Sequence, residues 1–499
     1  MKYRKFGLVT AVVLLVACAG IEPQRNRMVD RASPVDPFNN WDWLPGSARQ
    51  DALVPLSNGP NALQWRLRAL RSASSSIDLQ TFIWKDDKVG LALVREVAAA
   101  AERGVRVRVL LDDSFTANAD PGIQALSQHP NISYRIYNPQ ALRSGGLVVR
   151  ELENLGDFAR INHRMHNKLL VVDGRVAFIG GRNQADEYFG YQNKQNFRDL
   201  ELMVTGPILQ QLDEVFDLYW NDPWTFPFDE LDRAGGDQGF QQMKMWLDGN
   251  ALTYADKAVS TRQEWSAVLA DEYPANLRLL VDRPPEAGPD IDAPVQLGNE
   301  LLRIIDSVQR DLILVAAYFI PTAALTDAIR RAVDRGVRVR VLTNSLGSNN
   351  HVSAHAAYAR HRPELLRAGV ELYELRADAA SRELYLDPSV LDSELGLHAK
   401  SLVFDDCCLF VGSANLDPRS LRINTEVGLL IDSPALNRAV RRLLAVDLLP
   451  ENAWRVELDS QGDIVWVGHE GMQRHTPPAS FYLRAESWFF GLLPIEEQM

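Results

Sequence analysis

The stretches HNKLLVVD, at residues 166–173, and HAKSLVFD, at residues 398–405, decide the fold of this 499-residue chain. They are nearly the same eight letters, and each carries a His, a Lys and an Asp at the same internal spacing. The second stretch begins 232 residues after the first. A repeat of this period indicates that the chain contains two copies of one structural unit.

The repeat extends well beyond these stretches. ERGVRVRVLLD at 102–112 returns as DRGVRVRVLTN at 334–344. In both copies a helical segment ends at a glycine, Gly104 or Gly336, and an alternating strand follows. Apolar strands are expected upstream, at 77–84 and 312–320, and three more strands follow each loop. The sequence therefore predicts an α/β fold in which each half is a mixed β-sheet flanked by helices.

Composition shifts suggest where these units begin and end. We expect an N-terminal domain, a connector that begins near GGDQG at 235–239, a second domain, and a tail packed on that second domain. The predicted ranges are 1–18 for a signal peptide, 19–45 for a tether, 46–235, 236–275, 276–440 and 441–499.

The N-terminus has the pattern of an export signal. A positive start, with Lys2, Arg4 and Lys5, precedes an apolar run that ends in LVAC at 15–18. This run is short for a bilayer-spanning helix and resembles a bacterial lipoprotein signal, in which Cys18 would carry acyl chains such as palmitate. An ordinary signal peptide is the alternative. We expect a lipid-anchored protein on the exported, periplasmic side, with inner or outer membrane left open.

The other two cysteines, Cys407 and Cys408, are adjacent in an apolar run. They are expected to be small residues in a buried strand rather than part of a disulfide framework.

Each repeated stretch belongs to a longer motif, H-x-K-x4-D, followed by GGRN at 180–183 or GSAN at 412–415. Residues two apart on a strand point to the same side, so each His and its Lys should project into one site. The Asn that ends each glycine turn can reach the same place. Two such copies with matching downstream residues favour a functional site over chance.

These residue types suit phosphodiester chemistry. A neutral imidazole can attack phosphorus while a second imidazolium protonates the leaving alkoxide. Ammonium and amide groups can bind the non-bridging oxygens. We therefore expect one active site shared by both halves, related by a pseudo-twofold axis, that needs no metal and no cofactor.

With its paired motifs the chain resembles the phospholipase D superfamily, which works through a phosphohistidine intermediate. The resemblance implies that His166 and His398 are the nucleophile and the general acid/base, with His166 the predicted nucleophile. Asp173 and Asp405 complete the catalytic motifs, but their implied role is structural, at turns. The implied phosphate-binding residues are Lys168, Lys400, Asn183, Ser413 and Asn415.

A carboxylate should orient each histidine. Glu426 fits the position implied by the family, and aligning Pro207 with Pro434 places Asp199 opposite it. A surface carboxylate on an edge strand is the alternative. The two motifs differ at one position, where the first has Gly181 and the second has Ser413, so the halves are not equivalent. Arg182, beside that glycine, is either an anion-binding residue or an ordinary surface arginine.

The segments RMHNKLLVVDG, GGRNQADEYF and WFFGLLPIEEQM resemble the bacterial cardiolipin synthase C branch. This implies transfer of a phosphatidyl group to phosphatidylglycerol, with phosphatidylethanolamine or phosphatidylglycerol as the second lipid. A formal net charge of −12 disfavours nucleic acid as a partner. We expect phospholipid substrates at a membrane surface and a monomer with an internal pseudo-dimer. The alternatives are a hydrolytic phospholipase D, a periplasmic nuclease and a lipid-binding protein without catalysis.

Overall fold

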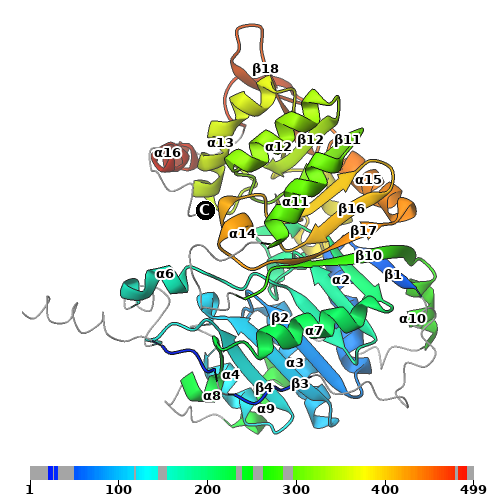
Figure 1. Ribbon diagram of the computed structural model, residues 1–499, viewed down its shortest axis with the longest axis vertical. Coiled ribbons are helices and arrows are strands. Elements are labelled where there is room, and N and C mark those ends of the chain that lie inside the picture. Colours follow the sequence, from blue (N-terminus) through cyan, green and yellow to red (C-terminus); the bar gives the residue numbers. More distant parts are fainter. Residues whose placement is uncertain are drawn as a thin grey trace, which may run out of the picture.

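Two similarly built units lie one above the other in the chain, and strand β10 runs between them (Figure 1). The computed structural model describes residues 21–25, 27–31, 50–116, 120–143, 154–231, 239–250, 262–284, 296–477 and 481–491. The predicted signal peptide and Cys18 lie outside these residues.

Within the described residues, eighteen strands form one continuous mixed sheet. Its spatial order, from the strand pairings, is β9-β4-β3-β2-β5-β6-β8-β1 followed by β10-β17-β16-β15-β11-β12-β13-β18-β19-β20. The second run repeats the first in reverse and adds the β19–β20 hairpin, as a pseudo-twofold axis between β1 and β10 requires. The predicted α/β tandem repeat is therefore confirmed.

The strands of the first half are β1 (Asp51–Leu56), β2 (Ser76–Thr81), β3 (Arg106–Asp112), β4 (Ile132–Tyr137), β5 (Leu169–Val172), β6 (Val176–Gly180), β8 (Glu201–Thr205) and β9 (Thr225–Pro227). Those of the second are β10 (Tyr273–Val281), β11 (Asp311–Val315), β12 (Arg338–Asn344), β13 (Glu371–Leu375), β15 (Ser401–Phe404), β16 (Cys408–Gly412), β17 (Val427–Asp432), β18 (Ala453–Leu458), β19 (Ile464–Gly468) and β20 (Gly471–Gln473). A separate parallel pair joins β7 (Gln195–Arg198) to β14 (Glu394–Leu397).

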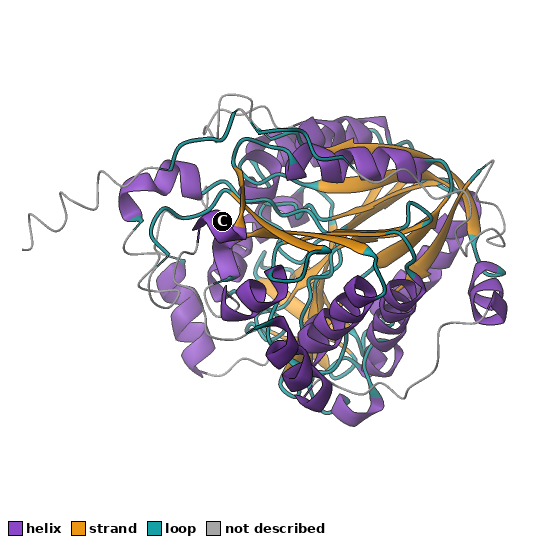
Figure 2. Ribbon diagram, turned by 90° about the horizontal axis from the view of Figure 1, so that it is seen from below, coloured by secondary structure: helices purple, strands orange, loops and turns teal. Residues whose placement is uncertain are grey.

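Helices cover both faces of the sheet, as the view from below shows (Figure 2). They are α2 (Gly59–Ser72), α3 (Lys88–Glu102), α4 (Asp120–Ser127), α6 (Phe158–Ile161), α7 (Ile208–Trp220), α8 (Phe228–Leu231), α9 (Phe240–Asn250), α10 (Arg262–Leu269), α11 (Gln296–Ser307), α12 (Ala323–Asp334), α13 (Val352–Arg367), α14 (Pro418–Arg422), α15 (Pro434–Asp447) and α16 (Phe481–Phe490). Short 3₁₀ turns occupy Asp113–Phe115, Leu155–Asp157, Asp186–Tyr188, Ala380–Leu384 and Pro388–Val390.

The predicted helix-to-strand junctions are confirmed. The Asp87 side chain caps α3 by accepting from the Gly90 N–H, and Thr322 caps α12 in the same way. Beyond each helix, Gly104 and Gly336 have φ angles of 93° and 85°, a left-handed conformation that glycine adopts at little cost. The chain can then turn directly into β3 or β12.

The predicted apolar strands at 77–84 and 312–320 are shorter in the structure. β2 ends at Thr81 and β11 ends at Val315. After each of these strands the backbone leaves the sheet and runs toward the loops that carry the motifs. The isolated bridges Trp84↔Gln184 and Phe319↔Leu416 show this. An apolar run therefore continued into the site loops, where burial also favours apolar residues.

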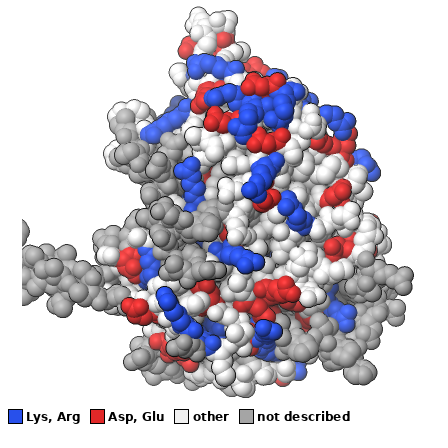
Figure 3. Space-filling view, in the orientation of Figure 1, with Lys and Arg blue, Asp and Glu red and all other residues white. Residues whose placement is uncertain are grey.

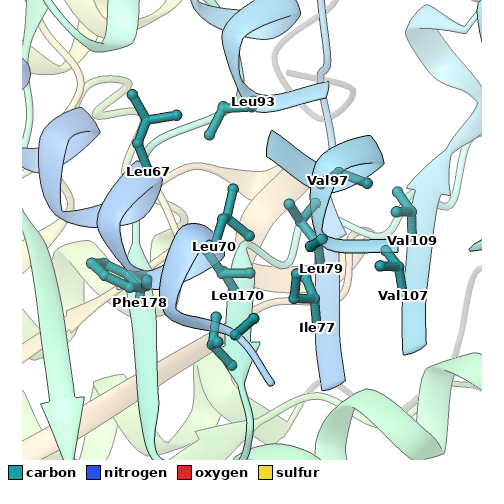
Figure 4. Packing of buried hydrophobic residues seen from close by; sticks show 14 of the residues in the cluster. Leu67, Leu70, Ile77, Leu79, Leu93, Val97, Val107, Val109, Leu170 and Phe178 are labelled. Atoms are coloured by element: carbon teal, nitrogen blue, oxygen red, sulfur yellow. The ribbon is translucent and has the colours of Figure 1, made fainter. Parts of the chain in front are cut away.

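Three hydrophobic clusters hold the layers together. One packs α2 and α3 on the sheet of the first half, with Leu67, Leu70, Leu93 and Val97 facing Leu79 and its neighbours (Figure 4). A second packs the helices of the other half on its sheet. The third joins both halves, because it contains residues of α7 and α15 together with strands of both copies. The halves therefore share a continuous core, which fixes the position of anything built between them.

The segments outside the repeat contact it. Part of the predicted tether lies against the first half, where the Gln24 N–H donates to the Pro223 carbonyl at 2.7 Å. The connector contains α9 and α10, and β10 already begins at Tyr273. The predicted bound at residue 440 falls inside α15, and β18 in the tail pairs with β13. The domain bounds otherwise stay a prediction.

Cys407 and Cys408 form a disulfide beside the turn between β15 and β16, and both are half-buried. This differs from the expectation of two unbonded small residues in a buried strand, because adjacent cysteines can bond without any wider framework. Among the described residues, they and Asp432 are the only group of His, Cys, Asp or Glu close enough to share a metal ion, and the disulfide occupies both sulfurs.

No helix within the described ranges is long and apolar enough to cross a bilayer. On the face drawn in Figure 3, basic and acidic side chains are interspersed rather than gathered into a single basic groove. Among the described residues of this face, the basic side chains form no extended surface of the kind that binds the nucleic-acid backbone.

Candidate active site

The two motif histidines are held by main-chain hydrogen bonds from the opposite half. The His166 N–H donates to the Thr425 carbonyl at 2.9 Å, and the His398 N–H donates to the Arg198 carbonyl at 2.9 Å. Each His-x-Lys therefore lies in an extended segment just before its strand, β5 or β15, rather than within it as predicted. The segment pairs with the other half instead of with its own sheet, and this brings both motifs to the interface.

Each histidine is also oriented by a carboxylate from the other half. His166 Nδ1 lies 2.9 Å from Glu426 Oε2, and His398 Nδ1 lies 2.7 Å from Asp199 Oδ2. All four side chains are buried. An ionised carboxylate can only accept, so Nδ1 carries the ring proton and Nε2 presents a lone pair whenever the partner carboxylate is ionised. The structure thus places Asp199 and Glu426 in the predicted contact, and the pairing crosses between the halves.

The motif lysines lie beside these pairs. Lys168 Nζ donates to the His166 carbonyl at 2.7 Å, and Lys400 Nζ donates to the His398 carbonyl. Burial lowers the pKa of Lys168 well below its ordinary value and that of Lys400 to about 8, with Asp199 and Glu426 opposing both shifts. The site therefore sets two lysines from opposite halves against two buried carboxylates.

Both imidazoles are neutral near pH 7. Burial, followed by the charge of the neighbouring lysines, lowers the pKa of His166 well below its usual range. The same causes, opposed by Asp199, lower the pKa of His398 to about 3. An anionic phosphate between them would favour the protonated form again. Such a site can supply a neutral nucleophile and can protonate a leaving group once substrate is bound.

The two carboxylates differ in their own protonation. Burial would raise the pKa of Asp199, but His398, Arg182 and Lys400 hold it well below its ordinary value. For Glu426 burial dominates over Lys168 and Ser413 and raises the pKa to about 7. Asp199 is therefore a permanent anion, whereas Glu426 titrates near neutrality.

The residue beside each carboxylate explains the difference between GGRN and GSAN. The Ser413 hydroxyl donates to Glu426 Oε2 and accepts from the Val427 N–H at 3.0 Å. In the structure the hydroxyl proton of Ser413 is directed at Glu426, and the predicted phosphate-binding role of Ser413 stays a prediction. At Gly181, a Cβ would lie 2.6 Å from Asp199 Oδ1, so this position has no room for a serine.

Arg182 is fully buried and donates to main-chain carbonyls, among them that of Ser57 at 2.9 Å. It is therefore neither a surface arginine nor directed at a head group. Its charge lowers the pKa of Asp199.

The motif asparagines are both buried at the end of the glycine turns. Asn183 Oδ1 accepts from the Ile83 N–H at 3.2 Å, which settles the orientation of its amide. Asn415 Oδ1 is buried and has no hydrogen-bond partner among the described residues. Their phosphate-binding role stays a prediction.

The motif aspartates lie at the far ends of β5 and β15 from the lysines. Asp173 and Asp405 have φ angles of 52° and 45°, and each accepts several N–H groups of the loop before β2 or β11. These contacts fit the structural role implied for both residues and place neither beside a histidine.

Three aromatic rings lie against the histidines, and none of them was predicted from the sequence. Phe82 lies edge-on to His166 with ring centroids 5.0 Å apart, and Tyr188 and Phe197 lie 4.9 and 5.2 Å from His398. Tyr188 and Phe197 follow GGRN closely in the sequence, and this was the available signal for them. Phe82 lies in the apolar run at 77–84, far from both histidines in the sequence, and carried no such signal.

A family model described as "Cardiolipin synthase, PLD-like domain" matches residues 67–220 and 301–447, which together exceed half of the chain. The chain belongs to this PLD-like domain family. The two matched ranges correspond to the two halves of the sheet, and each contains one His-x-Lys motif.

Relatives match along most of the chain. Cardiolipin synthase C of Escherichia coli (strain K12) is 34% identical over 458 residues, which cover 90% of this chain and 96% of that protein. An uncharacterized protein of Helicobacter pylori (strain J99) is 31% identical over 91% of both chains. Among solved structures, a phosphatidylserine synthase of Haemophilus influenzae has a TM-score of 0.58 at 14% identity, covering 90% of this chain and 98% of that one, which shows the shared fold. The predicted superfamily and branch are confirmed.

Proposed function

We propose that this PLD-like protein is a phosphatidyltransferase that makes cardiolipin from phosphatidylglycerol and a second phospholipid. The observation that carries the proposal is the crossed pairing of His166 with Glu426 and His398 with Asp199, beside Lys168 and Lys400. The family description and the identity to Escherichia coli cardiolipin synthase C support the lipid substrate.

In the first step, Nε2 of His166 attacks the phosphorus of the donor phospholipid. The bond from phosphorus to the head-group oxygen breaks, and that oxygen takes a proton from His398. Asp199 favours this assignment, because a carboxylate whose pKa lies well below its ordinary value stabilises the imidazolium that His398 must form. The products are a phosphatidyl group on His166 and a free head-group alcohol.

In the second step, a hydroxyl of phosphatidylglycerol attacks the same phosphorus and gives its proton to His398. The phosphorus–nitrogen bond breaks, and His166 is regenerated. Lys168, Lys400, Asn183 and Asn415 supply donors for the non-bridging oxygens, where charge accumulates in both steps. This assignment routes no step through a metal ion.

Water competes with the acceptor lipid in the second step. The rings of Phe82, Tyr188 and Phe197 lie against the histidines and would restrict the access of water to the phosphohistidine. This favours transfer to a lipid hydroxyl over hydrolysis. A hydrolytic phospholipase D is the outcome if this exclusion fails.

The proposal includes attachment to a membrane on its exported side through a lipidated Cys18. Its support is the sequence alone, a basic start and a short apolar run that ends in LVAC. Replacing Cys18 with Ser should move the protein from the membrane fraction to the soluble fraction.

The decisive test mixes the purified full chain with vesicles of phosphatidylethanolamine and phosphatidylglycerol, with EDTA present, and identifies lipids by mass spectrometry. Cardiolipin from the wild type, and none from His166→Ala or His398→Ala, would support a metal-independent phosphatidyltransferase. Phosphatidic acid without cardiolipin would replace the proposal with a phospholipase. Loss of cardiolipin only when EDTA is present would contradict metal independence.

A further inference from the structure

A cavity of about 550 Å³ lies in the second half, between α13 and α16. None of its lining residues belongs to the candidate active site. Its volume lies in the range of pockets that bind small molecules. Apolar side chains, including Ile464, Trp466 and Trp488, form part of the wall.

The rest of the wall is basic. The cavity is lined by Arg362, Arg474, Arg484, His355 and His475, and none of the described lining residues is an Asp or a Glu. This is unusual in a chain with 65 acidic and 53 basic residues. Arg362 and Arg474 have acidic partners nearby, but Arg484 donates to the Thr476 carbonyl at 3.0 Å, a contact that neutralises no charge. The cavity therefore favours an anionic ligand.

The imidazole of His355 has an N–H group that fits an oxygen-bearing ligand. Its Nε2 lies 2.7 Å from Nη2 of Arg362, and a guanidinium can only donate, so the ring proton is on Nδ1. Nδ1 is buried and has no hydrogen-bond partner among the residues that the structure describes. Burial, followed by Arg362, lowers the pKa of His355 well below its usual range, so the ring is a neutral donor. A buried donor without an acceptor is costly, and a ligand oxygen in the cavity would satisfy it.

Helix α16, which forms one wall of the cavity, carries aromatic side chains that are exposed. Tyr482, Trp488 and Phe489 are 82%, 69% and 55% exposed. Tyr482 and Phe489 are seven residues apart and so share one face of the helix. In Figure 1, α16 lies on the outer side of α13, toward the same edge of the view as α6, the helix that leads into the His166 segment. Exposed Trp and Tyr at such a place are typical of a bilayer interface.

We propose that the cavity between α13 and α16 binds the phosphate of an anionic phospholipid head group while the aromatic residues of α16 lie in the bilayer interface. Arg484 and Arg474 would contact the phosphate, and His355 Nδ1 would donate to one of its oxygens. This site is separate from the catalytic histidines and does not depend on which lipid they convert.

The test measures binding rather than turnover. The full chain carrying Cys18→Ser, which removes any acyl anchor, is titrated with vesicles of pure phosphatidylcholine or of phosphatidylcholine containing phosphatidylglycerol. Arg484→Gln should weaken binding to the anionic vesicles about fivefold, as expected for one arginine near a charged surface. Trp488→Ala should weaken binding to both kinds of vesicle.

Arg303→Gln is the matched control, because Arg303 is an exposed arginine of α11 that pairs with Glu300 and does not line the cavity. It should change binding by less than twofold. Equal losses for Arg303→Gln and Arg484→Gln would mean non-specific attraction and would overturn the proposal. Unchanged vesicle binding in Arg484→Gln would do the same.

Titration with inorganic phosphate separates a lipid from a free anion when it is followed by the part of the tryptophan fluorescence change that Trp488→Phe abolishes. Saturation by millimolar phosphate that depends on Arg484, without any effect of this residue on vesicle binding, would reassign the cavity to a soluble ligand. His355→Gln, which keeps a side-chain donor, should retain more vesicle binding than His355→Phe. Equal binding by these two variants would contradict the role of Nδ1.

Discussion

The two histidine–carboxylate pairs of the candidate site have the same topology and different chemistry. His398 is held by Asp199, whose carboxylate occupies the space that a side chain at Gly181 would need. His166 is held by Glu426, which receives a further hydrogen bond from Ser413. Eight strands of the sheet correspond between the halves, whereas the two orienting carboxylates and their neighbours at 181 and 413 differ.

This difference separates the two histidines electrostatically. The ionised Asp199 favours positive charge on His398, whereas Glu426, with its pKa raised to about 7, is only partly ionised at neutral pH. A histidine that must become an imidazolium is better placed beside Asp199. The difference between the two carboxylates therefore assigns acid/base catalysis to His398 and nucleophilic attack to His166.

The largest effect is expected from the histidines themselves. His166→Ala and His398→Ala should each lower phosphatidyl transfer by at least about 10⁴-fold, because one removes the nucleophile and the other the proton donor. A donor whose leaving group needs no protonation should distinguish them. With a nitrophenyl ester of phosphatidic acid, His398→Ala should form a phosphatidyl adduct on His166, detected by mass spectrometry after rapid quenching.

An adduct on His398 in the wild type would reverse the assignment. The same ester incubated with His166→Ala provides the control, because that variant should form no adduct.

The glycine beside Asp199 provides a sharper test of the asymmetry. In Gly181→Ser the new side chain would push the Asp199 carboxylate away, and we expect kcat/KM to fall about 100-fold because His398 loses its orientation. Ser413→Gly only removes one hydrogen bond to Glu426, so its loss should stay below about tenfold. Melting curves show whether both variants fold. Equal losses in the two folded variants would contradict unequal support of the two histidines.

The pKa values predict different pH responses for the carboxylates. Above pH 7 Glu426 is mostly ionised and differs from Gln in charge, whereas at pH 6 about nine in ten molecules already carry a protonated Glu426. The ratio of wild-type to Glu426→Gln activity should therefore fall about tenfold between pH 8 and pH 6. Asp199 remains ionised at both values, so the ratio for Asp199→Asn, about 100-fold, should not change.

Steady-state kcat/KM across this pH range decides the question. A ratio for Glu426→Gln that is flat with pH would show that Glu426 does not titrate near neutrality, and the electrostatic part of the comparison would be lost.

Much of the fold could be predicted because both copies of the repeat contain local sequence patterns that indicate helix ends and strands. The glycines that end α3 and α12 and the alternating strands after them are read from neighbouring residues. The chain's shortened strands β2 and β11, and the extended segments of His166 and His398, could not be placed from the sequence. Their positions depend on contacts with the other half, such as the bond from His166 to Thr425, which no local pattern records.

The candidate site divides in the same way. The family resemblance selected Glu426, and the offset between the halves then selected Asp199, since equivalent positions in a repeat take equivalent places. It could not show that each carboxylate serves the other half's histidine, because crossing is a property of the interface. It also could not show that Ser413 is committed to Glu426, or that Gly181 is required by the Asp199 carboxylate.

The motif aspartates offer the smallest and most structural comparison. Asp173 is buried and accepts from the N–H groups of Ser74, Ser75 and Ser76 at 2.8 Å, and from two of their hydroxyls at 3.0 Å. Asp405 is less buried and accepts three N–H groups, two of them at 3.2 and 3.3 Å. Asn tolerates the positive φ of both positions, so Asp→Asn changes the hydrogen bonds and not the backbone.

We therefore expect Asp173→Asn to cost about 3 kcal/mol and Asp405→Asn about 1 kcal/mol. For a unit of about 200 residues this corresponds to losses of roughly 6–12 °C and 2–4 °C in Tm. Thermal melting followed by circular dichroism measures both, and the activity of the protein that stays folded should remain near that of the wild type. Equal shifts would mean that the loops before β2 and β11 are anchored equally, whereas a loss of activity without a loss of stability would make these aspartates part of the chemistry.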